Sequence, residues 1–424
     1  MILAGFSLMA ILGTSGTNAR AQGGAAAADT ADDPVRTLVG RLDLEKYKAT
    51  IKGLAQFGDR RQGTKRNRDA VDWIEVQLKS YGCQNIERVT YQYAPAPPAQ
   101  RGAAGGAGGR GAAAGGGRGG RGAPPYAVPG KGWAGNGPGG SRIFSDMRER
   151  GVNNDSLAQP DPAIRAINME PSTPGERQEV ICMKVGTKYP NEMYIIGGHM
   201  DGIGWGQAAN DDASGSAIVM ELARIFAMPD VQTERSIRFA LWNNEETGLN
   251  GARAYVEQRN PMQGKESPAG SGKYPEPKWL GMIQHDMMMV DHGPPTPDGK
   301  LAPEQRAEAD INIEFAITSK MADDAMKLAF TLKLANNKYA THYPATVGPH
   351  MSNTDSDPFK DIVAAISLRE NERGSQIGGN WDPTHHQPTD VLTTFTDKDF
   401  MLGLTSAQTT LGAVGTLTGA TVKK

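Results

Sequence analysis

Hydrophobic positions along the chain follow two alternating patterns, one with the period of a helix and one typical of a buried strand. Segment 67–81 carries apolar residues three or four positions apart and stops at Gly82, a residue that favours the end of a helix. Residues 193–197 form a continuous apolar run, which is typical of a parallel strand covered on both faces. The same criteria predict strands at 89–93, 179–185, 236–242, 279–286, 311–318 and 362–368, and helices at 214–226, 320–335 and 398–415. This alternation predicts the α/β fold class, as a three-layer α/β/α sandwich with a mixed, largely parallel central sheet.

Polar residues that can bind metal stand at the ends of these predicted elements. His199 follows a strand, Asp211 precedes a helix, and Asp286 ends another strand. Glu245 and Glu246 follow a further strand. Open α/β sheets bind ligands outside the carboxyl ends of their strands, so we expect these side chains to converge there.

Together with the sequence THHQPTD around His386, these segments supply the ligands of a pair of divalent ions. Zinc takes imidazole nitrogen and carboxylate oxygen, so a catalytic pair needs about two His, three carboxylates and one base that binds no metal. Each segment alone is typical of a structural feature, since NDD before a helix is usually a capping turn and an EE pair is usually a solvated face. Their joint occurrence at strand ends favours a two-metal hydrolase site.

The set of motifs resembles that of the secreted co-catalytic zinc aminopeptidases, peptidase family M28. The resemblance covers most of residues 36–424, and the segment FGDRRQGTKRN also looks like the N-terminal part of the family. The matching pieces are HMD at 199–201, NDDASG at 210–215, NNEETGLNGA at 243–252, the Asp of IQHDM at 286, and HHQPTD at 385–390, which is similar to the YHTPxD of the family.

The resemblance implies a ligand set for two zinc ions, with other divalent ions as alternatives. One ion is expected to be held by His199, Asp211 and Asp286. The second is expected to be held by Asp211, Glu246 and His386. Asp211 would bridge the two ions at a separation of roughly 3.5–4 Å, with one water between them.

The remaining roles follow from the same resemblance. Glu245 would stay free of metal and act as the general base, which takes the proton of the water and passes it to the leaving amine. Asp201 is expected to orient His199, and Asp355 is expected to orient His386.

His385 marks a departure from the family, which commonly has Tyr at this position. This residue is therefore the candidate that stabilises the oxyanion, with an imidazole in place of a phenol. Asp286 is favoured over Asp291 as the ligand at the strand end. We expect loop or supporting roles for the flanking His285 and His292.

The resemblance implies a dinuclear zinc exopeptidase that acts on peptide substrates, most directly an aminopeptidase that removes N-terminal residues. A related zinc carboxypeptidase or a glutaminyl cyclase is the alternative. The complete ligand set disfavours a one-zinc cyclase, and a carboxypeptidase needs a basic pocket that the sequence does not locate. A receptor-like relative without activity would require lost ligands, and none is lost.

Composition disfavours a nucleic-acid partner. The chain has 45 Lys plus Arg against 47 Asp plus Glu, so no net field attracts phosphate backbones. The Gly-, Ala-, Arg- and Pro-rich stretch at about 94–140 is similar to RGG segments that bind RNA. We expect it to be a disordered, solvated insertion, because it has few large apolar residues to offset the entropy of ordering. A second surface loop is expected at about 259–278.

The N-terminus resembles a targeting segment. Residues 2–13 form an apolar run too short to span a bilayer as a mature helix, and Ala19-Arg20-Ala21 fits an A-x-A cleavage site. We therefore expect a signal peptide at 1–21, a linker at 22–35 and a zinc peptidase domain at 36–424, exported to the periplasm or the exterior. An uncleaved anchor is the alternative, and no stable membrane span is expected in the mature chain.

The two cysteines, Cys83 and Cys182, are too few for a disulfide scaffold. They could form one bridge, but the sequence favours two buried free thiols, because pairing cannot be read from it. Oligomeric state and substrate side-chain preference are not predicted.

Overall fold

The central sheet runs through the core of the chain and sets the position of every other element. The computed structural model describes residues 33–94, 152–293, 295–351, 353–370 and 382–423. The predicted signal peptide and nearly all of the predicted insertion at 94–140 therefore lie outside the described residues. The helices and strands of the described residues belong to the unit from Pro34 to Lys424.

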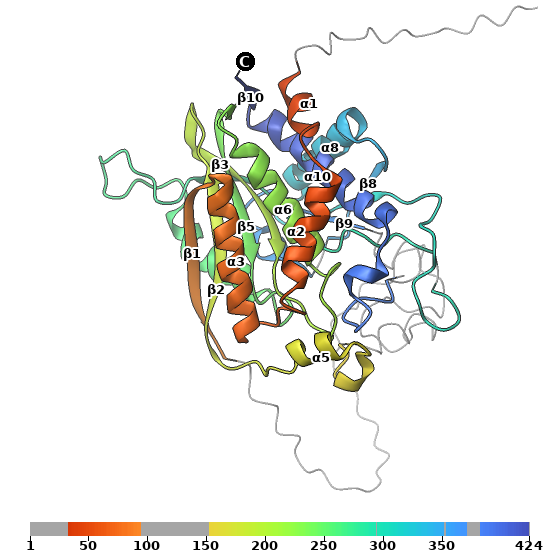
Figure 1. The fold of residues 1–424 in the computed structure, drawn as a ribbon. Helices are drawn as coiled ribbons and strands as arrows, with labels where there is room; N and C mark the ends of the chain where they lie inside the picture. Colours follow the sequence, from red (N-terminus) through yellow and green to blue (C-terminus); the bar gives the residue numbers. More distant parts are fainter. Residues whose placement is uncertain (1–32, 95–151, 294, 352, 371–381, 424) are drawn as a thin grey trace, which may run out of the picture. The chain divides into compact units, whose positions relative to one another are not determined.

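Eight of the described strands form this sheet, in the order β1-β2-β5-β3-β6-β9-β7-β8 (Figure 1). Strands β5, β3, β6 and β9 are parallel neighbours, and β7 is parallel to β8. The pairs β1–β2, β2–β5 and β7–β9 are antiparallel. The mixed sheet with a parallel centre is therefore confirmed. The strands are β1 Gln84–Tyr93, β2 Gly175–Lys184, β3 Tyr189–His199, β5 Arg235–Trp242, β6 Lys278–His285, β7 Ile311–Phe315, β8 Ala345–Gly348 and β9 Ala365–Arg369.

Helices cover both faces of this sheet, which confirms the α/β/α sandwich. One face packs against α2, α3, α6, α8 and α10, whose apolar side chains join those of the strands in one core (Figure 1). On the other face, Tyr255 of α7 packs with Trp242, Trp279 and Phe359 in an aromatic cluster. The helices are α1 Pro34–Val39, α2 Leu44–Ala55, α3 Lys65–Tyr81, α5 Pro162–Asn168, α6 Ala213–Phe226, α7 Asn250–Arg259, α8 Ala322–Tyr339 and α10 Asp397–Leu417.

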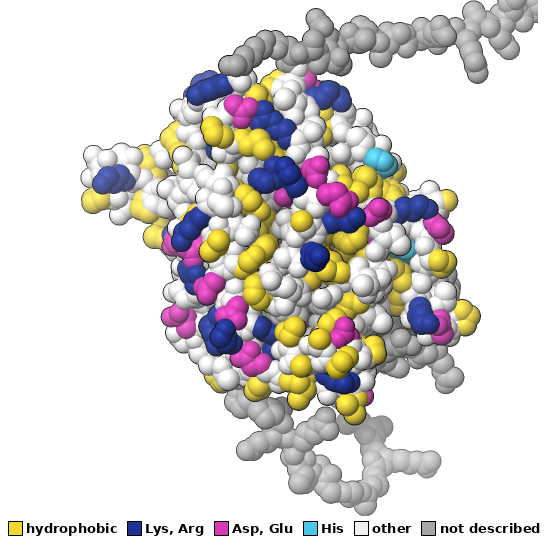
Figure 2. Space-filling model, in the orientation of Figure 1, with side chains coloured by type: hydrophobic (Ala, Val, Ile, Leu, Met, Phe, Trp, Pro, Cys, Tyr) yellow, Lys and Arg dark blue, Asp and Glu magenta, His cyan; other side chains and the backbone are white. Residues whose placement is uncertain are grey.

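Several elements were not predicted from the sequence. Helices α1, α2, α5 and α7, the short strand β8, and the separate pair β4 (Val231–Gln232) and β10 (Thr421–Val422) are among them. On the face shown in Figure 2, Lys and Arg side chains are interspersed with Asp and Glu. None of the helices in the described part of the chain is long and apolar enough to cross a membrane.

Three neighbouring strands end at the same edge of the sheet. Strand β3 pairs in parallel with both β5 and β6, with His199 opposite Trp242 and Gly197 opposite Gln284. The residues that follow these strands therefore start side by side, as expected for the carboxyl edge of a parallel sheet.

A glycine allows helix α6 to lie against this edge. A Cβ on Gly198 would lie 2.8 Å from the backbone of Gly215 in the first turn of α6, closer than any side chain tolerates. The N-terminus of α6 is buried on all sides, and Asp212 is its N-cap. The close approach places the turn before α6 beside His199.

The loop between α7 and β6 lies at the surface over most of its length, where the surface loop was predicted. Its last part is anchored by Glu276, which is fully buried. The Glu276 carboxylate accepts hydrogen bonds from Arg238, from the Tyr255 hydroxyl at 2.7 Å and from Trp279 Nε1 at 2.7 Å. A buried, fully paired carboxylate therefore ties the loop to the aromatic cluster.

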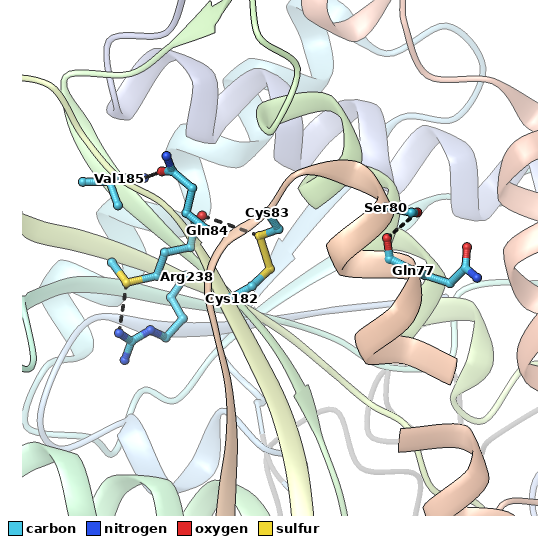
Figure 3. Close-up of a disulfide and its surroundings, with 8 residues drawn as sticks. Gln77, Ser80, Cys83, Gln84, Cys182, Val185 and Arg238 are labelled. Carbon is cyan, nitrogen blue, oxygen red and sulfur yellow. Dashed lines mark hydrogen bonds between the residues drawn. A yellow bond between two sulfur atoms is a disulfide. The ribbon is translucent and has the colours of Figure 1, made fainter. Parts of the chain in front are cut away.

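The expectation of two free thiols was wrong, because Cys83 and Cys182 form a disulfide (Figure 3). Cys83 lies between α3 and β1, and Cys182 lies on β2. The antiparallel register places Gln84 opposite Met183, so the two cysteines become neighbours with their Cα atoms 6.0 Å apart. This register is a property of the folded sheet, and the sequence contains no local signal for it.

Removing the bridge should destabilise the protein. We expect the double variant Cys83→Ala, Cys182→Ala to lose about 2–5 kcal/mol of unfolding free energy, because the bridge constrains a long segment of the unfolded chain. Urea unfolding of both proteins measures this loss. Reductant should shift the wild-type transition and leave that of the double variant in place. Two reactive thiols in the denatured, unreduced wild type would contradict the bridge.

Candidate metal centre

His199, Asp211 and Asp286 meet at the carboxyl edge of the sheet. His199 Nε2 lies 3.3 Å from Asp211 Oδ1 and 3.6 Å from Asp286 Oδ1. All three side chains are buried. One ligand atom of each lies within 4.8 Å of the others, so one nitrogen and two carboxylate oxygens converge on a single point. This donor set is one that zinc takes in proteins.

A second group lies on the other side of Asp211. His386 Nε2 is 3.2 Å from Asp211 Oδ2 and 2.8 Å from Glu246 Oε2. Asp211 thus turns Oδ1 toward His199 and Oδ2 toward His386. Glu246 Oε1 is buried and accepts no hydrogen bond among the described residues, which is costly for a carboxylate without a cation. The structure therefore brings His199, Asp211 and Asp286 into one group and places Glu246 against His386 on the other side of Asp211. The chemistry of these five predicted ligands fits divalent metal.

Mutual charges shift the pKa values of the central groups. Burial lowers the pKa of His199, but the carboxylates of Glu245 and Asp212 raise it to a net value well above the ordinary one. Burial raises the pKa of Asp211, and hydrogen bonds with His199 and His386 lower it to well below its usual range. The carboxylate between the two groups is therefore held ionised, as a metal ligand must be.

Arg369 holds the ligand at the end of β6. Its Nη2 lies 2.6 Å from Asp286 Oδ2, and both side chains are buried. Burial raises the pKa of Asp286, but the guanidinium of Arg369 lowers it to a net value below the usual range. The pair keeps Asp286 ionised and leaves Oδ1 facing His199. Arg369 was not predicted from the sequence, because nothing in the local pattern of β9 distinguishes it.

Glu245, the predicted base, directly precedes the proposed ligand Glu246. Its side chain is almost fully buried, and burial raises its pKa well above that of an ordinary glutamate. The backbone N–H of Glu245 donates to Asp201 Oδ1 at 3.0 Å. A buried carboxylate with a raised pKa is suited to accept a proton near neutral pH.

Asp201 and Asp355, the two residues predicted to orient metal-binding histidines, differ in their contacts with those histidines. Asp201 contacts His199 mainly through its backbone oxygen, which lies 3.0 Å from His199 Nδ1, while its carboxylate is 3.9 Å away. Asp355 is buried and accepts a hydrogen bond from Gln284 at 3.4 Å. No contact with His386 is seen for it among the described residues, so the structure does not support the predicted role of Asp355.

The residues around Asp286 lie outside the two groups, as expected. His285 Nε2 lies 2.9 Å from Thr410 Oγ1. Asp291 pairs with Arg306, and His292 Nε2 lies 2.6 Å from Asp399. These side chains have structural partners. Their positions favour Asp286 over Asp291 as the metal ligand.

The sequence marked Asp212 only as part of the NDD turn before a helix, where Asp212 or Ser214 could be the cap, but it joins three segments of the site. Its Oδ2 accepts the backbone N–H of His199 at 3.0 Å, and its Oδ1 accepts those of Gly215 at 2.8 Å and Met287 at 3.2 Å. His199 is a predicted ligand, and Met287 follows the ligand Asp286. One buried carboxylate thus sets the spacing of the residues proposed for the first ion.

Asp390 makes the corresponding connection for the HHQPTD segment. Its two oxygens accept the backbone N–H groups of Asn210 at 2.8 Å and Asp211 at 3.1 Å. Burial raises its pKa to about 8. Because His386 belongs to the same segment, Asp390 fixes that segment against the shared carboxylate. The signal was present as the last residue of the motif, but only the fold shows what it contacts.

The buried guanidinium of Arg60 holds the loop after His199. It donates to the backbone oxygens of Met200 at 2.7 Å, Gln207 at 2.7 Å and Ala208 at 2.8 Å. Arg60 belongs to the FGDRRQG segment, which is similar to the family but had no predicted role. The position of Arg60 shows that this segment holds the loop after His199 in place.

Backbone conformation around the site is unusual. Asn244, Met287 and His386 have φ values of 65°, 56° and 57°, in the left-handed region that favours glycine. Each of them is a predicted ligand or lies within two residues of one. Such conformations cluster at functional sites, where the surrounding structure enforces them.

Comparison with known proteins places these features in a family. The model of Peptidase family M28 matches residues 179–402, which is more than half of the chain. The chain belongs to peptidase family M28. It is therefore a metallopeptidase, a hydrolase, and the family implies zinc in the site described above. The predicted family is confirmed.

Individual relatives match shorter regions. Carboxypeptidase Q of Xenopus laevis is 38% identical over 73 residues, 17% of this chain and 16% of that protein. An aminopeptidase of Pseudomonas aeruginosa is 36% identical over 80 residues, 19% of this chain and 15% of that protein. The matches thus span about a sixth of the length of these relatives. A zinc aminopeptidase from Bacillus subtilis has a TM-score of 0.55 at 13% identity, covering 90% of this chain and 96% of that one, which shows the shared fold.

The contacts of Asp212 predict that its substitution changes both the stability of the protein and its stabilisation by zinc. Asp212→Asn replaces one acceptor oxygen by an amide that faces a backbone N–H, so metal-free stability should fall by about 1–3 kcal/mol. The rise in melting temperature on zinc addition should also shrink, because His199 and Asp286 are no longer held at their spacing. Calorimetry with and without zinc measures both effects.

Asp399→Asn is the matched control for this variant. Asp399 is equally buried and accepts the backbone N–H of Thr396 in the capping box of α10, away from the candidate site. Its loss should lower the stability of both forms by the same amount. A full zinc-dependent rise in the Asp212 variant would show that Asp212 does not position ligands.

Proposed function

We propose that the chain is a dinuclear zinc exopeptidase, and specifically an aminopeptidase that removes N-terminal residues from peptides. The observation that carries the proposal is the position of Asp211, which turns one oxygen to His199 and the other to His386 at 3.3 and 3.2 Å. A carboxylate placed between two His- and carboxylate-containing groups is the arrangement of a shared ligand.

The proposed ligand set is the predicted one. His199, Asp211 and Asp286 would hold one ion, and Asp211, Glu246 and His386 would hold the other. Zinc ions bound there would polarise the scissile carbonyl and lower the pKa of a coordinated water toward neutrality.

The protein's own residues would then move the proton. Glu245 is buried within reach of the charge of His199 and is not needed as a ligand, so its carboxylate is available as the base. It takes the proton of the attacking water and returns it to the nitrogen of the leaving amine. Asp201 supports this position by accepting the backbone N–H of Glu245.

The charge of the site favours the amino end of a peptide. Among the described residues, the Lys and Arg side chains seen in contact with a proposed ligand come down to one, Arg369. Its partner is the ligand Asp286, so this cation is already paired. A carboxypeptidase needs a cation that is free to bind the substrate carboxylate, whereas a surplus of carboxylates suits a free amine. The carboxypeptidase stays the second candidate, because a relative named carboxypeptidase Q aligns with part of the chain.

Export is part of the proposal. The Cys83–Cys182 bridge supports it, because disulfides persist in oxidising compartments such as the periplasm and the exterior. Cell fractionation with detection of the mature N-terminus tests it. A cytosolic protein with an intact leader would contradict export.

The shared ligand gives the first test of this function. Asp211→Asn should lower zinc content at both positions and reduce turnover far more than it reduces metal-free stability. Metal analysis together with aminoacyl and carboxyl-terminal reporter substrates measures these effects. Two tightly bound ions and near-normal turnover in this variant would contradict the dinuclear assignment, and faster cleavage of the carboxyl-terminal reporters by wild type would favour the carboxypeptidase.

The two neighbouring glutamates should differ in phenotype. Glu245→Gln removes the proton acceptor but leaves the ligands, so we expect two bound ions and turnover lower by about 10²–10⁴. Glu246→Gln serves as the matched control, because it removes a proposed ligand and should lower the content of one ion. Metal loss in the Glu245 variant alone would reverse the two roles.

A further inference from the structure

His385 lies at the candidate site but has no place in the proposed ligand set. Its Nε2 is 3.4 Å from Asp211 Oδ2, the same oxygen that His386 Nε2 approaches at 3.2 Å. The two imidazole rings lie side by side, with centroids 3.8 Å apart. Two nitrogen donors from consecutive residues therefore face one oxygen of the shared carboxylate.

Consecutive side chains in an extended segment point in opposite directions, so this arrangement needs a special backbone. His386 supplies it, with a φ of 57° in the left-handed region. The turn is held in place on both sides. Asn153 donates to the His386 backbone oxygen at 3.1 Å, and a Cβ on Gly204 would lie 2.2 Å from the His386 carbonyl carbon. The backbone thus directs both rings toward Asp211.

The donor atoms on this side of Asp211 are enough to fill the coordination of one zinc ion. Asp211, His385 and His386 each offer one ligand atom within 4.8 Å of the others. Glu246 Oε2 lies outside this group of three but 2.8 Å from His386 Nε2, so it adds a fourth donor beside the cluster. Zinc held by four protein donors is typically tetrahedral and closed, whereas zinc held by three keeps a position for water or substrate.

We propose that His385 is a metal ligand, so that the second ion takes four protein donors, Asp211, Glu246, His385 and His386. This inference rests on the proposed function and makes the two ions unequal. The site of the second ion has no open position, and the ion is tightly held. The first, with His199, Asp211 and Asp286, keeps the open position at which substrate is bound.

This role excludes donation of a hydrogen bond to the oxyanion from Nε2, the ring atom of His385 that faces Asp211. The Nε2 atom that coordinates a metal uses its lone pair and carries no proton, so it cannot also be the donor. The two roles therefore predict opposite results for metal affinity.

The test is a metal titration of His385→Phe, which keeps a planar ring and removes both nitrogens. Metal-free wild type and variant are titrated with Zn²⁺ by calorimetry and with Co²⁺ by absorption spectroscopy. One ion should bind to the variant more weakly by more than the roughly 10–100-fold that loss of a residue supporting a ligand costs. The other ion should keep its affinity, and the spectrum of the weakened Co²⁺ site should change.

His342→Phe is the matched control, because His342 is an exposed histidine that contacts Thr341 outside the candidate site. It should bind both ions as wild type does. His385→Gln is the second variant, and it should weaken the same ion without placing an apolar ring in a side-chain position that is 36% exposed.

Unchanged affinity for two ions in both His385 variants, with an unchanged Co²⁺ spectrum and lower turnover, would overturn the ligand role in favour of the oxyanion role. A wild-type protein that binds a single ion would instead overturn the dinuclear function. The affinity of that ion in the His385 variants would still decide whether His385 is a ligand.

Discussion

The candidate site depends on one buried carboxylate that accepts three backbone N–H groups. Asp212 connects the end of β3, the first turn of α6 and the residue after Asp286. Each of these segments carries or adjoins a proposed ligand, and none of them is close to the others in sequence. Strands and a helix fix the positions of these backbone N–H groups. The carboxylate that accepts them therefore holds the neighbouring proposed ligands at fixed positions relative to the sheet. Asp390 extends the same principle to the segment of His386.

This construction gathers carboxyl groups in a buried part of the protein. Asp201, Asp211, Asp212, Glu245 and Asp286 are all buried within the same small region. The two proposed zinc ions would balance the charge of such a set, and Arg369 supplies further positive charge at Asp286. The unusual backbone at Asn244, Met287 and His386 belongs to the same construction, because proposed ligands from five segments must turn toward the same site.

The sequence predicted the layers, the strand ends and the ligand set, because each depends on local pattern or on a motif. The end of β3 at His199 and the start of α6 after Asp212 follow from apolar periodicity and capping. It could not predict the partners of Asp212, Asp390 or Arg369, since these depend on which backbone groups the fold brings near. The bridge between Cys83 and Cys182 was missed for the same reason, because strand register is a long-range property. The role of Asp355 was implied by the family resemblance, and the fold gives this side chain another partner.

The position of that bridge has a topological consequence. Cys83 and Cys182 enclose residues 84–181, and the Gly- and Arg-rich stretch lies inside this interval. A peptide bond cut anywhere in the interval opens the chain but leaves both fragments covalently joined. A protease that trims this stretch outside the cell would thus produce a nicked enzyme that runs as one molecule until it is reduced. All proposed metal ligands lie beyond residue 198, on the C-terminal fragment, while Arg60, which holds the loop after His199, lies on the N-terminal one.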